Sequence, residues 1–375
     1  MSAHSKNFLK VAFLSVVLSL ILGAVVILIL GKNPLSAYYN LLQGCGLMPK
    51  AKYGGGQSQL TDFSSYVDYW TPMIFAALSC AFAMKAGLFN IGISGQMLTA
   101  GFIATVTVGY SNLPGVVAKP LVIIIGAAAG MGVGALIGFL KYRFNINEVV
   151  SSIMLNYIAK YIISFFIQTF CIDPVSRQSK NISDAARLTF HQTEIGGCKY
   201  DLPIGFLLAI AATIIVKFVM DKTTYGYDLK AVGLNRTAAN YAGIHVGRNI
   251  VSSMAISGLL AGIAGVTYYL GYFASIQPKV LISTGFDAIA VCLLGNSDPL
   301  GIFVASFLIE IISKGSAYMS SQAGLESEIA SVITGLILLA SACNAFFIGR
   351  LERREDRKRI SLAAAANAGK EAGNA

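Results

Sequence analysis

The chain has 375 residues, of which 55% are hydrophobic and only 12% are charged. Soluble domains carry about 25% charged residues, so this chain has too few to cover a globular surface of its size. We therefore expect a polytopic membrane protein. The net charge of +10 fits basic cytoplasmic loops better than nucleic-acid binding, because the basic residues cluster in particular loops.

The first predicted span covers residues 11–30, an apolar run that follows a polar N-terminal stretch. About 20 apolar residues are enough to cross a bilayer. A cleaved signal peptide is the alternative, but the run is longer than the usual apolar core and no small-residue cleavage site ends it. A polar loop at 31–69 and a second predicted span at 70–84 follow.

Residues 86–96, with the sequence AGLFNIGISGQ, are the most unusual stretch. They join two apolar runs and contain three glycines together with Asn90, Ser94 and Gln96. The stretch is half apolar, so we expect backbone that leaves helical geometry at membrane depth. Unpaired peptide groups in hydrocarbon are costly, so such a break needs protein or water to satisfy it. Breaks of this kind are typical of the solute pathway in transporters.

The later predicted spans are 97–108, 120–140, 149–170, 203–220, 249–274, 283–294, 300–314 and 328–348. Glycines at 126, 130, 134 and 138 recur every four residues, a spacing that lets a neighbouring helix approach closely. A second long polar loop covers 171–202, and a second glycine-bearing break covers 295–299. The fold class is therefore an all-α polytopic membrane protein with about ten transmembrane helices, some of them broken.

The distribution of Lys and Arg predicts the orientation. With the N terminus inside and alternating spans, most basic residues fall in inside segments, which favours cytoplasmic N and C termini. We expect a transmembrane permease-type domain at 1–349, with an inner loop at 221–248. The basic tail at 350–375 has no apolar periodicity, and we expect it to be disordered.

The inner loop contains a signal for one short helix. Asn235 is a good N-cap and Gly243 a good C-terminal stop. About two helical turns between them are too short to be stable alone. The helix must therefore dock either on the inner ends of the other spans or on a cytoplasmic partner, and these alternatives stay open.

The sequence lacks the motifs of an enzyme. No nucleotide-binding P-loop, HExxH or GxSxG pattern is present. His4, His191 and His245 lie too far apart in the topology to share a metal ion, so we expect no metal site. The six cysteines have no CxxC spacing, although one bridge among Cys45, Cys171 and Cys198 remains an alternative.

Four stretches resemble the permease subunits of bacterial ABC importers, in the branch that includes ribose-type sugar permeases and nucleoside permeases. They are 85–96 (KAGLFNIGISGQ), 147–157 (NEVVSSIMLNY), 231–244 (AVGLNRTAANYAGI) and 285–301 (GFDAIAVCLLGNSDPLG). They lie in the family's order, and together the resemblance spans roughly residues 70 to 315. Members usually have Glu where this chain has Ser94.

The resemblance implies the membrane-spanning subunit of an ATP-driven ABC importer in a bacterial cytoplasmic membrane. The implied solute is small and polar, a nucleoside more than a simple sugar. The implied partners are an ABC ATPase subunit, an extracytoplasmic substrate-binding protein and a second permease subunit, either this chain or a homologue. The chain itself is then not an enzyme and holds no cofactor, because its ATPase partner binds ATP.

Two sets of site residues follow from the break and from the resemblance. The candidates for the translocation pathway are Phe89, Asn90, Ser94, Gln96 and Asn156. The alternative for each is that it only satisfies a broken helix or packs. The candidates for coupling to the ATPase are Gly233, Asn235, Ala238, Ala239, Tyr241 and Gly243. No residue is expected to be catalytic.

Two other functions compete with this interpretation. A secondary transporter driven by an ion gradient needs acidic residues within its spans, and Glu310 is the best candidate in the sequence. An integral membrane enzyme needs a cluster of His, Asp or Glu at the membrane face, and the sequence shows none. We interpret Asp287 and Asp298 as helix caps rather than pathway groups.

Overall fold

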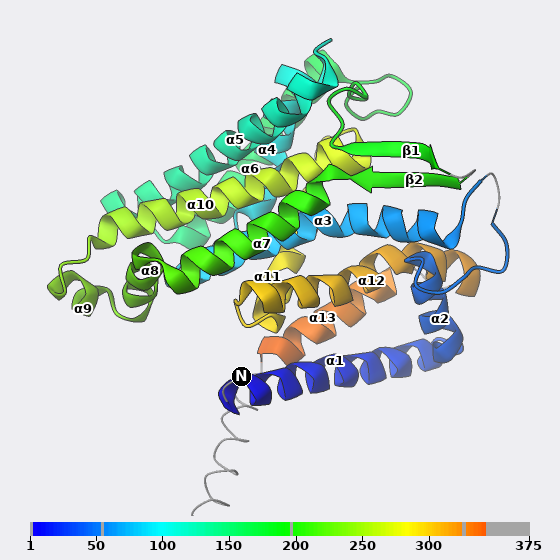
Figure 1. Ribbon diagram of the computed structural model, residues 1–375, viewed down its shortest axis with the longest axis horizontal. Coiled ribbons are helices and arrows are strands. Elements are labelled where there is room, and N and C mark those ends of the chain that lie inside the picture. The colour runs from blue at the N-terminus through cyan, green and yellow to red at the C-terminus, as the bar shows by residue number, and fades with distance from the viewer. Residues whose placement is uncertain (1–2, 54–55, 196–197, 325–327, 343–375) are drawn as a thin grey trace, which may run out of the picture. The chain divides into compact units, whose positions relative to one another are not determined.

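The computed structural model describes residues 3–53, 56–195, 198–324 and 328–342. The described chain is mostly helical (Figure 1). It divides into two compact units, one that contains the described residues of 3–34 and 331–342 and one that contains those of 35–330. The predicted tail at 350–375 lies outside the described residues.

The smaller unit contains α1, Ala3–Ile29, and most of the C-terminal helix α13, Glu328–Ala342. α1 agrees with the predicted first span at 11–30. α13 begins at the predicted residue 328, and its described part ends at Ala342.

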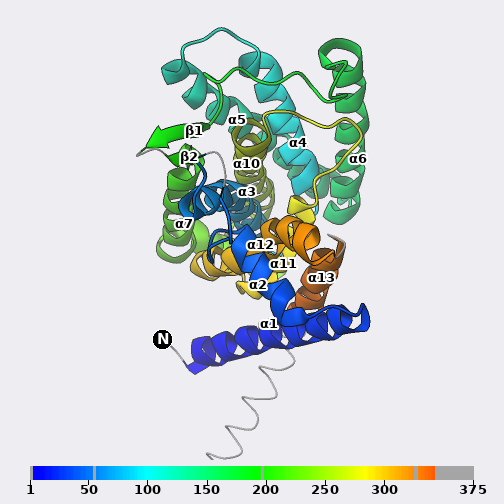
Figure 2. The same ribbon diagram turned by 90° about the vertical axis from the view of Figure 1, so that its right-hand side faces the viewer.

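The larger unit contains the remaining helices and both strands. Helix α10 packs against α5, α3 and α4, and Figure 2 shows it between α5 and α3. α4, α6 and α10 each continue into a short π-helical turn, named η1 to η3. The elements are α2 (Pro34–Gly44), α3 (Gln59–Lys85), α4 (Ile93–Ala104), η1 (Thr105–Gly109), α5 (Gly115–Phe144), α6 (Glu148–Phe166), η2 (Ile167–Cys171), β1 (Thr189–Ile195), β2 (Cys198–Pro203), α7 (Ile204–Lys222), α8 (Thr224–Leu234), α9 (Arg236–Tyr241), α10 (Val246–Thr267), η3 (Tyr268–Phe273), α11 (Thr284–Leu294) and α12 (Pro299–Ala323).

Six described helices are long and apolar enough to cross a membrane, or seven if 16–29 and 34–44 together form one span. These six are α3, α5, α6 with η2, α7, α10 with η3, and α12. The predicted spans at 97–108 and 283–294 correspond to α4 with η1 and to α11, which are shorter apolar helices. The structure therefore confirms a polytopic helical protein, whereas the predicted count of about ten is not confirmed.

The glycine repeat forms the crossing of α5 and α10, as its spacing predicts. A Cβ atom on Gly130 would lie 2.3 Å from the Gly258 carbonyl oxygen, and one on Gly134 would lie 2.2 Å from the Met254 carbonyl oxygen. Conversely, a Cβ atom on Gly262 would lie 2.2 Å from the Gly126 carbonyl oxygen. The two backbones are therefore in direct contact, which only glycine at these positions permits.

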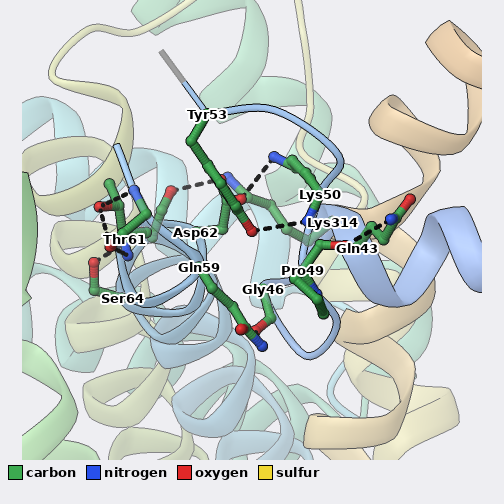
Figure 3. A network of polar contacts seen from close by, with 12 residues as sticks. Gln43, Gly46, Pro49, Lys50, Tyr53, Gln59, Thr61, Asp62, Ser64 and Lys314 are labelled. Carbon is green, nitrogen blue, oxygen red and sulfur yellow. Dashed lines mark hydrogen bonds and ion pairs between the residues drawn. The ribbon is translucent and has the colours of Figure 1, made fainter. Parts of the chain in front are cut away.

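Helix α3 begins at Gln59, well before the predicted start at residue 70. The polar residues of 59–69 led to the prediction of a loop, but Ser58 and Thr61 form a capping box that starts the helix there. The preceding loop is tied down by polar contacts (Figure 3), including an ion pair of 2.7 Å between Lys50 and Asp62. The Gln59 side chain also donates a hydrogen bond to the Gly46 carbonyl.

The second polar loop contains a two-stranded antiparallel sheet, which corrects the all-α prediction. β1 pairs with β2 from Thr189 opposite Pro203 to Ile195 opposite Cys198, with an irregularity after Phe190. The hairpin and the α8–α9 pair lie at opposite ends of the larger unit (Figure 1). In the described chain Cys45, Cys171 and Cys198 are free thiols, so none of the bridges left open by the sequence has formed.

Candidate translocation pathway and coupling segment

The predicted break between the second and third apolar runs is present, but it is shorter than expected. α3 ends at Lys85 and α4 begins at Ile93, so the non-helical residues are 86–92. Ser94, Gly95 and Gln96 belong to the first turn of α4, which corrects their placement in the break. The helix starts early, since the backbone N–H of Gln96 already donates to the Gly92 carbonyl at 2.9 Å.

Asn90 is the central side chain of the break and is fully buried. Its amide nitrogen donates to Gln96 Oε1 at 3.0 Å and to Ser257 Oγ at 2.8 Å. Its amide oxygen accepts from the Gly92 N–H at 2.9 Å. Ser257, on α10, in turn donates to the Ser79 carbonyl of α3 at 2.8 Å. Asn90 therefore joins the break to α4, α10 and, through Ser257, α3.

Asn156 on α6 spans the end of the same break. Its Oδ1 atom accepts from the Gly95 N–H at 2.9 Å, and its Nδ2 atom donates to the Ile91 carbonyl at 3.0 Å. A Cβ atom on residue 95 would lie 2.5 Å from Asn156 Oδ1, so glycine is needed for this approach. The amide satisfies two backbone groups that the break leaves without helical partners.

Ser94 links the first broken helix to the second. Its hydroxyl donates to the Ile282 carbonyl at 3.0 Å, just before α11 begins. A Cβ atom on Gly285 would lie 2.3 Å from Ser94 Oγ. The N-terminal ends of α4 and α11 therefore meet, although the chain separates them widely.

The structure thus brings together four of the five predicted pathway residues. Asn90, Ser94, Gln96 and Asn156 are buried and hydrogen-bonded within the protein, whereas Phe89 is half-buried. The sequence analysis did not identify Ser79 and Ser257, which complete the network. Both were visible as single polar residues within apolar runs, but that signal does not reveal their partners.

The second break, at 295–298, also has a buried backbone contact. A Cβ atom on Gly301 would lie 2.4 Å from the Gly295 carbonyl oxygen. Asp298 is the N-cap of α12 and accepts from the Gly301 N–H, as predicted, and it also pairs with Lys217. Asp287 is not the N-cap residue of α11, because Ser283 occupies that position and Asp287 lies in the first turn.

The inner loop at 221–248 holds two helices rather than one. α9 is the predicted short helix: Asn235 Oδ1 accepts from the Ala238 N–H at 3.0 Å, and Gly243 follows the helix end with φ of +82°. This left-handed conformation favours glycine at the C-terminal stop. α8 was missed, because Gly226 and Gly233 argue against a helix. Thr223 caps its start, accepting from the Gly226 N–H.

The two inner-loop helices carry an exposed apolar surface, which we name the α8–α9 patch and define as Tyr227, Leu234 and Tyr241. Leu234 and Tyr241 are both 89% exposed. Among the predicted coupling residues, Asn235, Ala238 and Gly243 are exposed as well, whereas Ala239 is buried and Gly233 is half-buried. The predicted coupling residues are therefore divided between a free surface and a contact with the rest of the unit.

The inward contact of this segment is made to the first break. A Cβ atom on Gly233 would lie 2.4 Å from the Lys85 carbonyl oxygen, and one on Gly87 would lie 3.0 Å from the Gly233 carbonyl oxygen. Arg236 also donates to the Gly87 carbonyl at 3.3 Å. The α8–α9 pair thus rests directly on the chain where α3 ends.

A polytopic helical fold with broken helices that meet inside the protein is typical of a membrane transporter. Comparison with known proteins agrees with this class. Residues 64–342 match the family described as the permease component of the branched-chain amino acid transport system. The match covers most of the chain, so the protein belongs to this family of ABC transporter permeases. It is a multi-pass protein of the cytoplasmic membrane. Members are transport subunits rather than enzymes, and they generally work with an ABC ATPase and a substrate-binding protein.

Individual relatives match most of the chain. The nucleoside ABC transporter permease protein NupB of Lactococcus lactis is 35% identical over 88% of this chain and 89% of its own length. The guanosine ABC transporter permease protein NupP of Bacillus subtilis is 34% identical over 93% of this chain and 98% of its own length. The glucose ABC transporter permease protein TsgB13 of Haloferax volcanii is 26% identical over 74% of each chain.

Proposed function

We propose that this chain is the membrane-spanning subunit of an ATP-driven importer that carries a nucleoside across the cytoplasmic membrane. Its similarity to the nucleoside and guanosine permeases supports this solute class, because it extends over nearly the full length of those proteins. The simple-sugar alternative has weaker support, since the glucose permease shares fewer residues over a smaller part of the chain.

The α8–α9 patch is the proposed docking site for the ATPase subunit. Large apolar side chains that are almost fully exposed mark interaction surfaces when they cluster. Leu234 ends α8 and Tyr241 ends α9, both side chains are almost fully exposed, and the two helices lie at one end of the larger unit (Figure 1). This is the observation that carries the proposal. ATP is bound by the partner, and the chain itself is proposed to hold no cofactor.

The hairpin β1–β2 lies at the other end of the larger unit, where a substrate-binding protein would dock. The distribution of Lys and Arg supports a topology in which α8–α9 and both chain termini are cytoplasmic. We propose a second permease subunit, identical or homologous, as the third partner. A topology with about ten spans requires that the shorter apolar helices, α4 with η1 and α11, cross the membrane together with neighbouring helices.

Phe89, Asn90, Ser94, Gln96 and Asn156 are proposed to border the translocation pathway. In this conformation their polar groups are satisfied within the protein, so solute passes only after the contacts around the break rearrange. Gly233 and Arg236 touch the break at Gly87. Motion of the ATPase therefore reaches the break through the α8–α9 pair.

A double substitution of the patch tests the docking role. Leu234→Ser with Tyr241→Ser removes exposed apolar area without removing a packing contact, so the chain should insert and fold normally. We expect the variant to lose most of the ATPase subunit on co-purification and to lose ATP-dependent nucleoside uptake in proteoliposomes.

The matched control is Val175→Ser, which removes an equally exposed side chain in the loop between η2 and β1. The control should keep the ATPase subunit. Retention of the ATPase subunit by both the double variant and the control would contradict docking at the patch. Failure of the intact transporter to import any nucleoside would contradict the solute class.

A further inference from the structure

A group of polar and aromatic side chains lies away from the first break. We name it the Tyr–Glu cluster and define it as Tyr69 on α3, Tyr268 and Tyr272 on η3, and Glu310 and Lys314 on α12. The rings of Tyr69 and Tyr272 are 5.1 Å apart and inclined at 67°. The Lys314 ammonium lies 4.5 Å from the Tyr272 ring centre and 5.4 Å from that of Tyr69.

Glu310 is the unusual member, because it is 2% exposed and its Oε2 atom has no hydrogen-bond partner among the described residues. An ionisable group in the middle of a span is costly and commonly functional. Lys314, one helical turn away, donates to the Tyr272 and Ser65 hydroxyl groups. Because Glu310 and Lys314 lie four residues apart on α12, their side chains lie on the same face of that helix.

The other members of the cluster are less deeply buried than Glu310. Tyr69, Tyr268, Tyr272 and Lys314 are all half-buried, so part of each side chain remains accessible. Tyr268 and Tyr272 lie on a π-helical turn, a geometry that is frequent at functional sites. Among the described residues, neither the first break nor the α8–α9 patch explains why a buried carboxylate and three tyrosines lie in this part of the protein.

We propose that the Tyr–Glu cluster is a resting site for the nucleoside during its passage through the permease. A nucleobase stacks on tyrosine rings regardless of its identity, because every base has a π-face. The free Glu310 oxygen accepts a hydrogen bond from a base N–H or a ribose hydroxyl, which supplies the partner that the protein lacks. This inference rests on the proposed function and names the contacts that separate a nucleoside from a simple sugar, which has no π-face.

Substitutions in the complete transporter test the site. With saturating nucleoside-loaded binding protein, Tyr272→Leu should lower the maximal uptake rate about tenfold, the loss expected for one stacking contact. Tyr272→Phe keeps the ring and should retain most of that rate. Glu310→Gln keeps the size of the side chain but weakens its acceptor, and it should slow uptake while ATP hydrolysis continues.

Tyr161→Leu is the matched control, because this tyrosine is 59% exposed on α6 and lies outside the cluster. It should leave uptake unchanged. Equal loss in Tyr272→Phe and Tyr272→Leu would overturn the stacking role. Normal nucleoside uptake by Glu310→Gln would overturn the role of the carboxylate, whereas a dependence on an ion gradient that is present in the unaltered transporter and lost in Glu310→Gln would identify Glu310 as an ion site instead.

A labelling experiment tests the same site in the unaltered protein, so its result does not depend on whether a substituted protein folds. Irradiation of the complete transporter with 8-azidoadenosine should label peptides containing Tyr268–Tyr272 or Glu310–Lys314, and unlabelled adenosine should compete. Labelling of the first break alone would overturn this site while leaving nucleoside import intact. Absence of both nucleoside uptake and labelling would overturn the site together with the proposed function.

Discussion

The side-chain amide of Asn156 replaces backbone partners at the end of the first helix break, where α4 begins. Its oxygen binds the Gly95 N–H and its nitrogen binds the Ile91 carbonyl. Two peptide groups at membrane depth thereby avoid the cost of remaining unpaired. Asn90 does the same for Gly92 while also reaching Ser257 on α10.

Replacing Asn156 with Leu should lower the free energy of unfolding by at least about 2 kcal/mol. The substitution keeps the approximate volume but leaves two buried backbone groups unpaired, each costing about 1–3 kcal/mol. Thermal unfolding of the purified protein in detergent measures the effect. Asn240→Leu is the control, because Asn240 is exposed on α9, and equal unfolding midpoints for the two variants would contradict the role of Asn156.

At this scale the sequence identifies the unusual residues but not their contacts. Asn90, Ser94, Gln96 and Asn156 stand out as polar residues in or beside apolar stretches, and the structure does gather them. Their partners Ser257 and Ile282 are distant in sequence, and no local pattern pairs them. The sequence therefore could not show that these four polar groups are satisfied internally in this conformation.

The packing of helix α5 against helix α10 depends on glycine. Every fourth residue of one α5 face is glycine, and the corresponding Cβ positions fall on backbone atoms of α10 or on its side chains. Gly132 lies on the same helix but has no atom within 4 Å of its Cβ position. One helix thus supplies both the test position and its control.

Gly134→Ala should destabilise the protein by about 1–3 kcal/mol or more, because overpacking forces the helices apart. Gly132→Ala should be neutral or stabilising by up to about 1 kcal/mol, since alanine is the better helix former. Thermal unfolding in detergent again separates the two variants. A Gly134→Ala protein as stable as Gly132→Ala would show that the two helices do not cross at this face.

Elements defined by local periodicity were predictable, and those that depend on distant contacts were not. The glycine repeat, the Asn235 cap and the Gly243 stop are each contained within one short segment. By contrast, the start of α3 is polar, and Asp68 is buried there because Thr189 of β1 donates to its carboxylate. The hairpin was missed for the same reason, because composition predicts a loop wherever polar residues are satisfied by tertiary contacts. α8 was missed because its two glycines argue against a helix.

Across the whole molecule, one chain of contacts leads from the α8–α9 patch to the proposed pathway. The patch continues into Gly233, whose backbone lies against Lys85 and Gly87 at the end of α3. The chain then passes through the break to Asn90, which is hydrogen-bonded to α10. A displacement of α8 cannot be absorbed at Gly233, because no side chain lies between the two backbones.

Gly233→Ala should therefore uncouple the transporter. Its added methyl group would lie 2.4 Å from the Lys85 carbonyl oxygen, so α8 must shift away from the break. We expect the ATPase subunit to remain bound on co-purification, while nucleoside uptake per ATP hydrolysed falls at least about tenfold, a coupling change of about 1.4 kcal/mol. Gly132→Ala serves as the control, and normal coupling in Gly233→Ala would rule out this route.

The meeting of Ser94 with Gly285 also constrains how the molecule can change over time. Ser94 fills the space that Gly285 leaves free, so a bulkier residue at 94 is tolerated only while 285 stays without a side chain. Mutational drift in one half of the polypeptide is thus limited by the other half. Descendants of this gene should inherit the two positions as a matched pair.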